Sequence, residues 1–283
     1  MHVALPSVRA LALEAAVAWG TLALVVAVWH PALTVLGMLV IATRQHALFI
    51  LYHDAVHGLI ARPRRLNDLL INVFVGIPQL LPIHVYRALH LVHHQHLGTE
   101  RDPERLLLYA GQPWAYAPLP PRTLVRQLLG DLLVWNNLAT GLRYLRERLA
   151  PTGRLRLPPA VVYPEFFLLA AGFWGVVALG AWSNPEVAAR AAFVWVVPLL
   201  TLTQAIQKVR SFAEHGANGL SYSWAPGWLG RLVLWPYHIS YHREHHARPD
   251  VPWFELPAAF PDRDARPGYT LPALLVADPD RRS

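Results

Sequence analysis

Histidine is the residue type whose number and spacing stand out in this chain of 283 residues, which has 15 histidines and no cysteine. Most of them lie between His46 and His246. Eight form three groups with the spacings HxxxH, HxxHH and HxxHH: His53 and His57, then His90, His93 and His94, then His242, His245 and His246. Because neutral imidazole binds iron, zinc, copper and nickel, these groups predict a metal site.

The HxxHH spacing is suited to two metal ions that lie side by side. On a helix, the two later histidines fall about 60° to one side and about 40° to the other side of the first. His215 adds a further imidazole beyond a long apolar segment. Nine imidazoles are too many for one ion, so we expect a dinuclear site. A lone HxxxH pair is usually coincidental or a buried hydrogen-bonded pair. A lone HxxHH group already favours ligation, and the combination of the three groups favours it strongly.

Carboxylates within or beside these groups are candidates to orient and polarise the ligands, because metal-bound imidazoles usually donate their second N–H to an acceptor. There are four such acids: Asp54, Asp102, Glu214 and Glu244. They are equally well explained as solvated acids or as partners of arginine. The residues leave the roles of four further histidines open: His46, His84, His96 and His238.

The elements that position the histidines are predicted to be all-α and to span a membrane. Charged residues make up 15% of the chain and hydrophobic ones 54%, whereas soluble domains carry about 25% charged residues. Four segments are long enough for the roughly 20 residues that a bilayer requires: about 11–29, 33–57, 161–182 and 187–206. The short turns 29–31 and 183–186 predict two antiparallel hairpins. Polar residues and prolines make 66–83 more typical of a re-entrant or interfacial piece.

The distribution of basic residues predicts the orientation. The net charge of +7 is carried almost entirely by arginine, and arginines cluster after the second span and before the third, whereas the hairpin turns have none. By the positive-inside rule, both termini and a helical cap at about 62–158 and 208–260 face the cytoplasm, and all histidine groups meet there. The chain is thus predicted to be one multi-pass membrane domain over 1–283, in the inner membrane if bacterial, with a loosely ordered tail at 261–283. Its first apolar segment is expected to be a span, not a cleavable signal.

The histidine groups and their flanks resemble those of the integral-membrane fatty acid desaturase superfamily, which also includes carotenoid ketolases and hydroxylases, alkane hydroxylases and sphingolipid desaturases. The resemblance runs from about residue 45 to 260. It rests on three stretches: HDAVHG at 53–58, HLVHH at 90–94 with GTERDP at 98–103, and YHREHH at 241–246 with PDVPW at 249–253 and LP at 256–257.

This resemblance implies a non-haem di-iron centre on the cytoplasmic side that activates O2 and attacks an unactivated C–H bond. It implies metal ligands at all three groups, and His215 matches an extra histidine that follows the last span in several members. In two places the chain departs from some relatives. Ser211 and His238 stand where those relatives have asparagine.

The predicted function is therefore desaturation of an acyl chain of a lipid or fatty acyl thioester, with O2 as co-substrate. Hydroxylation or ketolation of a carotenoid or another hydrophobic substrate is the alternative within the superfamily. Electrons are expected from a separate ferredoxin or cytochrome b5-like donor, because the chain has no cysteine for an iron–sulfur cluster. A metal-binding or metal-transport membrane protein is a further alternative, but it would need ligands at mid-bilayer. A nucleic-acid partner is not expected.

Overall fold

The structure is a computed structural model, and it describes residues 2–109, 121–149, 163–215 and 221–267. The chain divides into two compact units, which are treated in turn. Unit 1 comprises residues 1–86 and 160–203, and unit 2 comprises 87–159 and 204–283. Helices account for most of the described residues, as expected for an all-α chain.

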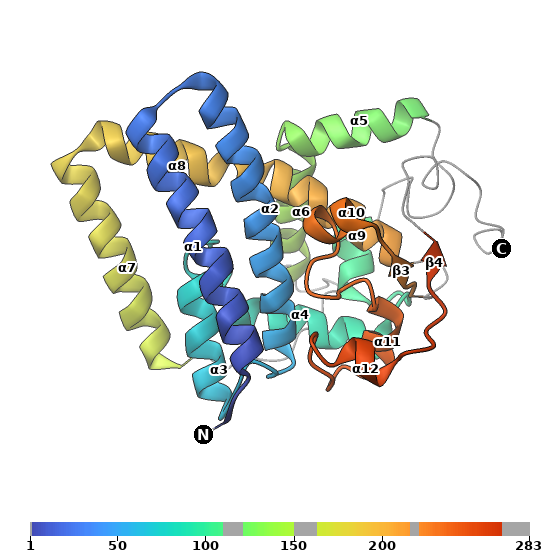
Figure 1. Cartoon of the computed structure of the whole chain (residues 1–283). Coiled ribbons are helices and arrows are strands. Elements are labelled where there is room, and N and C mark those ends of the chain that lie inside the picture. The colour runs from blue at the N-terminus through green and yellow to red at the C-terminus, as the bar shows by residue number, and fades with distance from the viewer. Residues whose placement is uncertain (1, 110–120, 150–162, 216–220, 268–283) are drawn as a thin grey trace. The chain divides into compact units, whose positions relative to one another are not determined.

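Unit 1 is built mainly from long apolar helices (Figure 1). Its elements are β1 (His2–Val3), α1 (Leu5–Val28), α2 (Pro31–Val56), β2 (Ala61–Arg62), α3 (Arg64–Ile71), the π-helical turn η1 (Asn72–Gly76), α7 (Pro164–Ser183) and α8 (Pro185–Leu200). Helices α4 (Ile83–His96) and α9 (Leu202–Glu214) each begin in unit 1 and continue into unit 2.

Within the described residues, four helical stretches are long and apolar enough to cross a membrane: Leu5–Val28, Pro31–Val56, Pro164–Ser183 and Pro185–Glu214. They correspond to the four predicted segments, except that residues 161 and 162 of the third lie outside the described part. The last stretch is longer than predicted, because helix continues as α9 beyond a local break at Thr201. Pro198 cannot donate the usual backbone hydrogen bond and lies just before that break.

Helices α1, α2 and α8 form the core of unit 1, and in Figure 1 α1 and α2 run side by side. Gly37 of α2 permits this close approach, since a Cβ atom there would lie 2.3 Å from Cγ2 of Val25 on α1, as small residues do at membrane helix interfaces. The Trp195 indole of α8 stacks on Trp19 of α1 with ring centroids 4.3 Å apart. Its Nε1 donates to the Pro78 carbonyl at 2.9 Å.

Buried polar side chains of unit 1 bond to one another and to backbone carbonyls. The Arg44 guanidinium on α2 binds the Glu14 carboxylate on α1 at 2.8 Å. The Gln45 amide donates to the Trp195 carbonyl at 3.0 Å and accepts from Thr203 Oγ1 at 2.8 Å. Burying a polar group without a partner in an apolar environment costs free energy. These bonds reduce that cost for the network.

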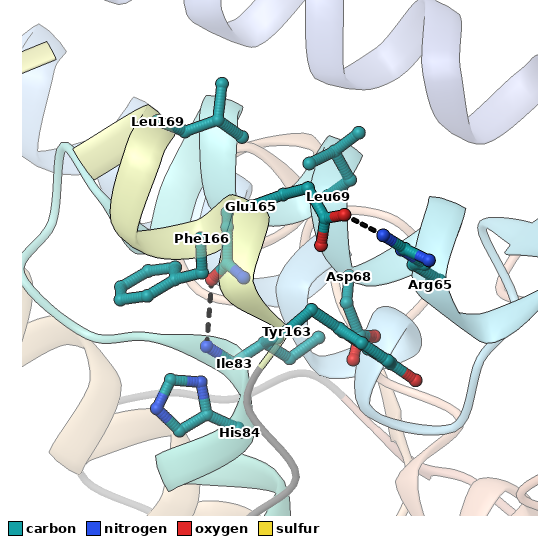
Figure 2. A pocket seen from close by; sticks show the side chains of 10 residues that line it. Arg65, Asp68, Leu69, Ile83, His84, Tyr163, Glu165, Phe166 and Leu169 are labelled. Atoms are coloured by element: carbon teal, nitrogen blue, oxygen red, sulfur yellow. Dashed lines mark hydrogen bonds and ion pairs between the residues drawn. The ribbon is translucent and has the colours of Figure 1, made fainter. Parts of the chain in front are cut away.

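Helix α7 differs from its neighbours because none of its residues is buried. Its first turn is tied to α3 by an ion pair between Arg65 and Glu165, beside a small cavity of about 40 Å³ (Figure 2). The segment predicted to be re-entrant or interfacial, 66–83, forms α3 and η1 on the other side of this cavity. In η1, the Asn72 side chain accepts the Ile83 backbone N–H at 3.0 Å, which holds the start of α4.

Unit 2 consists of shorter elements. They are the later part of α4, η2 (Arg105–Tyr109), α5 (Pro121–Leu132), α6 (Trp135–Leu149), the later part of α9, β3 (Trp224–Ala225), α10 (Trp228–Val233), α11 (His242–Ala247), α12 (Leu256–Ala259) and β4 (Arg266–Pro267). Strands β3 and β4 pair in parallel. Of the tail predicted to be loosely ordered, residues 268–283 lie outside the described part of the chain.

Candidate metal centre

Seven of the nine predicted ligand histidines lie in unit 2, six on two helices and one directly after a third. His90, His93 and His94 occupy the last two turns of α4, and His242, His245 and His246 lie on the short helix α11. His215 follows directly after the last residue of α9. All seven are buried or half-buried. Because their ring nitrogens are polar, each needs a hydrogen-bond partner or a metal ion there.

The Nε2 atoms of four of these rings converge, and we call these residues the first imidazole cluster: His93, His215, His242 and His246. Nε2 of His215 lies 2.9 Å from that of His242, 3.2 Å from that of His93 and 3.4 Å from that of His246. The Nε2 atoms of His242 and His246 are 3.1 Å apart.

The remaining three rings form the second imidazole cluster: His90, His94 and His245. Nε2 of His94 lies 2.9 Å from that of His90 and 3.3 Å from that of His245. The two clusters adjoin, because the rings of His94 and His246 stack with centroids 4.2 Å apart.

The two HxxHH groups divide between the clusters in opposite ways. On α4, the i and i+4 histidines belong to the second cluster and His93 belongs to the first. On α11, the i and i+4 histidines belong to the first cluster and His245 belongs to the second. Each helix therefore contributes to both clusters, as its angular spacing permits.

The Nδ1 atoms of three rings face oxygen atoms that can only accept a hydrogen bond. His93 Nδ1 lies 2.9 Å from Asp102 Oδ1, and His90 Nδ1 lies 3.1 Å from Glu104 Oε1. His215 Nδ1 lies 3.0 Å from the Ser211 backbone carbonyl. A carboxylate or a carbonyl requires the ring proton at Nδ1, so a neutral ring presents its lone pair at Nε2.

The loop after α4 holds Asp102 in place for this contact. Its carboxylate accepts the backbone N–H groups of Gly98 and Glu104, both at 2.9 Å, and that of Arg105 at 3.3 Å. Glu104, which sequence reasoning missed, lies two residues later in the same loop. Its proximity to the GTERDP string was the signal that could have found it.

The other two predicted carboxylates of unit 2 have different neighbours. Glu214 Oε2 lies 3.3 Å from His242 Nδ1 and also pairs with Arg210. Within the described residues, the Glu244 carboxylate contacts Ser223 and Arg243 and no imidazole. Glu214 is thus placed to orient a ligand ring, whereas Glu244 supports the loop around Ser223.

Burial and charge keep most rings of the first cluster neutral. Burial and the neighbouring His93 ring lower the pKa of His215 to about 4. Burial and the adjacent imidazoles also lower the pKa values of His242 and His246 well below the usual 6.5. His93 differs: burial lowers its pKa, but Glu104 and Asp102 together raise it above the usual value. The carboxylates beside this ring therefore favour a positive charge there.

This donor set fits metal ions. Ligand nitrogens bind at about 2.0–2.1 Å, so two adjacent ones on a tetrahedral or octahedral ion lie about 2.9–3.4 Å apart. The Nε2 atoms of neighbouring rings in both clusters are separated by distances in that same interval. Two Nε2 lone pairs cannot hydrogen-bond to each other, and the contact of His93 with His215 requires a cation or a proton. Nitrogen-rich sites suit iron, zinc, copper or nickel.

The last predicted ligands, His53 and His57, belong to unit 1. His53 lies in the final turn of α2 and His57 is the residue that caps this helix. Their rings are 5.7 Å apart between centroids, so they share one side of the helix end. Asp54 lies between them and is buried.

A comparison with known proteins agrees with this picture. The sequence profile of the family described as Fatty acid desaturase matches residues 27–274. A dihydrorhizobitoxine desaturase from Bradyrhizobium elkanii is 28% identical over 83% of this chain and 68% of its own length. A zeaxanthin 4-ketolase from Chlamydomonas reinhardtii is 29% identical over 74% of this chain. A ceramide hydroxylase from Caulobacter vibrioides is 23% identical over 66% of it.

The chain spans 40% of the length of the ketolase and 61% of that of the hydroxylase, so these relatives carry further sequence. The match nevertheless covers most of this chain and includes every histidine group. The chain therefore belongs to the fatty acid desaturase family.

Proposed function

We propose that the protein is a membrane oxidoreductase that uses O2, external electrons and a di-iron centre to desaturate an acyl chain of a lipid or fatty acyl thioester. The observation that carries this proposal is the convergence of imidazole Nε2 atoms into two adjoining clusters. The Nδ1 atoms of His90, His93 and His215 donate hydrogen bonds to oxygen atoms, which leaves Nε2 available for a metal ion. Membership of a family known for di-iron centres supports iron as the metal.

We assign one ion to the first imidazole cluster and one to the second. The first has four nitrogen donors, of which His93, His215 and His246 lie close enough together to hold one ion. The second has three, and we propose that His53 and His57 supply its further ligands. The HxxxH spacing at the end of α2 supports this assignment, because both side chains share one side of the helix end. The expected metal ligands are thus His53, His57, His90, His93, His94, His215, His242, His245 and His246.

Four acids are proposed to support these ligands: Asp54, Asp102 and Glu214 beside the rings, and Glu244 indirectly, through the loop around Ser223. Asp102 and Glu214 have the contacts that this role requires, since each lies within 3.3 Å of a ligand Nδ1. We add Glu104, which makes the same kind of contact to His90. Acceptors of this kind fix the tautomer and ring orientation and make the ligand more basic.

Bound iron would activate O2, the oxidant that takes two hydrogen atoms from the acyl chain and is reduced to water with two electrons from the external donor. The protein's own contribution is to bind the chain, to hold one carbon near the ligands and to exclude water. Burial of the substrate is favourable by about 0.8 kcal/mol per CH2. The protein also holds the ligand protons at Nδ1 of His90, His93 and His215, which keeps Nε2 available.

In the membrane, we propose two helical hairpins, α1–α2 and α7–α8, with both termini and the histidine groups at the cytoplasmic side. The arginines that flank the spans support this orientation. A ferredoxin or a cytochrome b5-like protein would then deliver electrons at the basic cytoplasmic surface, where opposite charge speeds encounter.

A second candidate function is hydroxylation or ketolation of a carotenoid or another hydrophobic substrate. Several relatives favour it, including the zeaxanthin 4-ketolase and the ceramide hydroxylase. Both candidates use the same metal site and differ in whether a second hydrogen is lost or oxygen is inserted into the substrate.

Lipid and pigment profiling of cells that express the chain tests this proposal and separates its two branches. New double bonds in acyl chains support desaturation, and hydroxylated or ketolated products support the alternative. His94→Ala and His246→Ala are the controls, because each removes a ring from one cluster. If the product persisted in either variant, the assigned site would be wrong.

A further inference from the structure

Unit 2 contains a second polar site, next to the histidine-rich helix α11 but distinct from it. A cavity of about 360 Å³ is lined by basic and aromatic side chains, and we call it the basic pocket. Its principal lining residues are Arg231, Trp235, His238, Tyr241, Trp253 and Arg263. A volume of this size is typical of small-ligand sites.

The titratable side chains that line the basic pocket are mainly basic, and none of the described ones is acidic. Two arginines and one histidine line it, and no carboxylate belongs to its lining within the described part of the chain. Burial and the charges of Arg231 and Arg263 lower the pKa of His238 below its usual value. The two guanidinium groups therefore act on the interior of the pocket, where a negative charge would be stabilised.

The Arg263 side chain lines this pocket and is held in one position by several contacts. Its guanidinium donates to the backbone carbonyls of Ser240 at 2.9 Å and Trp224 at 2.7 Å. It also lies 3.4 Å from the centroid of the Tyr241 ring, a cation–π arrangement. Such contacts hold its charge in one place whether or not a ligand is bound.

Arg231 is less constrained. Among the described residues, its guanidinium makes one hydrogen bond, from Nε to the Pro226 carbonyl at 3.2 Å. A guanidinium has five N–H donors in a planar fork, so most of its donor capacity is open to a ligand. The residue is exposed on α10, and its side chain can adjust to what enters.

The backbone between these arginines is strained. Tyr237 and His238 are both in the left-handed region, with φ values of 52° and 53°, where residues other than glycine are uncommon. The His238 ring lies parallel to that of Trp253, with centroids 6.0 Å apart at an angle of 26°. Strain of this kind is concentrated in ligand clamps and active sites.

We propose that the basic pocket binds the phosphate group of a phosphate ester, with Arg231 and Arg263 as the charged contacts and His238 as a further donor. Arginine forks match phosphate oxygens in geometry and charge, and the aromatic rings provide a surface for the organic part of the ester. The proposal does not depend on metal in the imidazole clusters. The phosphate could come from a lipid headgroup or from a soluble ester, and the test includes one probe for each.

The test uses the full chain purified in a neutral detergent at constant ionic strength. Its thermal unfolding midpoint is followed during titration with inorganic phosphate and, separately, with a short-chain phosphatidic acid. The wild-type protein should show a saturable rise with at least one probe. A lipid that binds at least tenfold more tightly than inorganic phosphate would identify the headgroup as the source, and equal binding would identify a soluble ester.

Arg231→Gln should weaken the apparent affinity by about tenfold or more, the usual cost of losing a charge-assisted hydrogen bond. Arg248→Gln is the matched control, because it removes the same charge from an exposed residue outside the pocket. His238→Asn is a second test, since asparagine tolerates the left-handed conformation, and it should weaken affinity severalfold.

Three results would overturn the proposal. They are no saturable response of the wild-type protein to either probe, an unchanged response in both pocket variants, and an equal loss in Arg231→Gln and Arg248→Gln. The last result would show that only net charge matters.

Discussion

The two units bury polar side chains in different ways. In unit 1, buried polar side chains pair across helices, as Glu14 does with Arg44 and Gln45 with Thr203. In unit 2, imidazole rings such as His93 and His215 face one another through their Nε2 atoms, while the Nδ1 atom of each of these two rings bonds to an oxygen acceptor. Burial alone therefore does not indicate function. A buried set of acceptors without donors indicates that a cation belongs there.

The largest effect should follow from removing a ring from either cluster. His94→Ala and His246→Ala should each reduce product formation below detection and lower the iron content, because the ion loses a nitrogen ligand. Activity, iron content and the amount of folded protein in the membrane are the measurements. Arg243→Gln, on the exposed side of the same helix α11, is the control and should retain both activity and iron.

The next largest effect should come from the carboxylates that hold the ligand rings. Asp102→Asn and Glu104→Gln should each weaken metal binding by about 10–100-fold, the usual range for such partners. Competition with a soluble chelator measures this change. Glu100→Gln lies in the same loop and is exposed, so it should have no such effect. Equal metal affinity in all three variants would contradict the role assigned to the loop.

In unit 1, breaking a buried pair should change stability but not metal content. Arg44→Leu leaves the Glu14 carboxylate buried without its main counter-charge, which costs about 3–5 kcal/mol in such pairs. Thermal unfolding in detergent should show the loss, and iron per folded chain should stay constant. The double variant Glu14→Leu and Arg44→Leu should recover most of the stability. A parallel loss of iron from the single variant would mean that this ion pair also supports the metal site.

The smallest effect is expected at an exposed pair of unit 2. Arg248 lowers the pKa of Asp250 to about 2 through a hydrogen bond. Because the pKa is lowered, any stabilisation is present above the usual pKa and is lost as the pH falls towards 2. Both side chains are exposed to solvent, where such pairs contribute little. Asp250→Asn should therefore leave the unfolding midpoint at pH 7 unchanged, and a clear decrease would contradict this.

The sequence predicted the long helices well, because hydropathy over about 20 residues reports burial in lipid directly. It was less exact at their ends. Helix α1 begins at Leu5, six residues before the predicted span, since helix can continue through polar residues such as Ser7 and Arg9. The helix past Leu200 was longer than predicted for the same reason, and it places His215 at the end of α9.

The histidine groups were evident from spacing, but several of their partners were not. Helical periodicity indicates which rings share a helix face, and it anticipated that an HxxHH group can point in two directions. It contains no information about contacts beyond the helix itself, so the contact of Glu104 with His90 could not be derived. The basic pocket also escaped detection, because its residues, at 226–263, follow no helical or strand periodicity that would place them around one cavity.

The central claim is that imidazoles from the three groups hold two iron ions in one centre. The most direct measurement is the iron content and Mössbauer spectrum of the active, purified chain, together with its absorption spectrum. The account predicts two irons per folded chain, no haem band, and loss of iron in the variant that combines His94→Ala with His246→Ala. Full activity with a single iron per chain, or with haem as the only metal group, would contradict it.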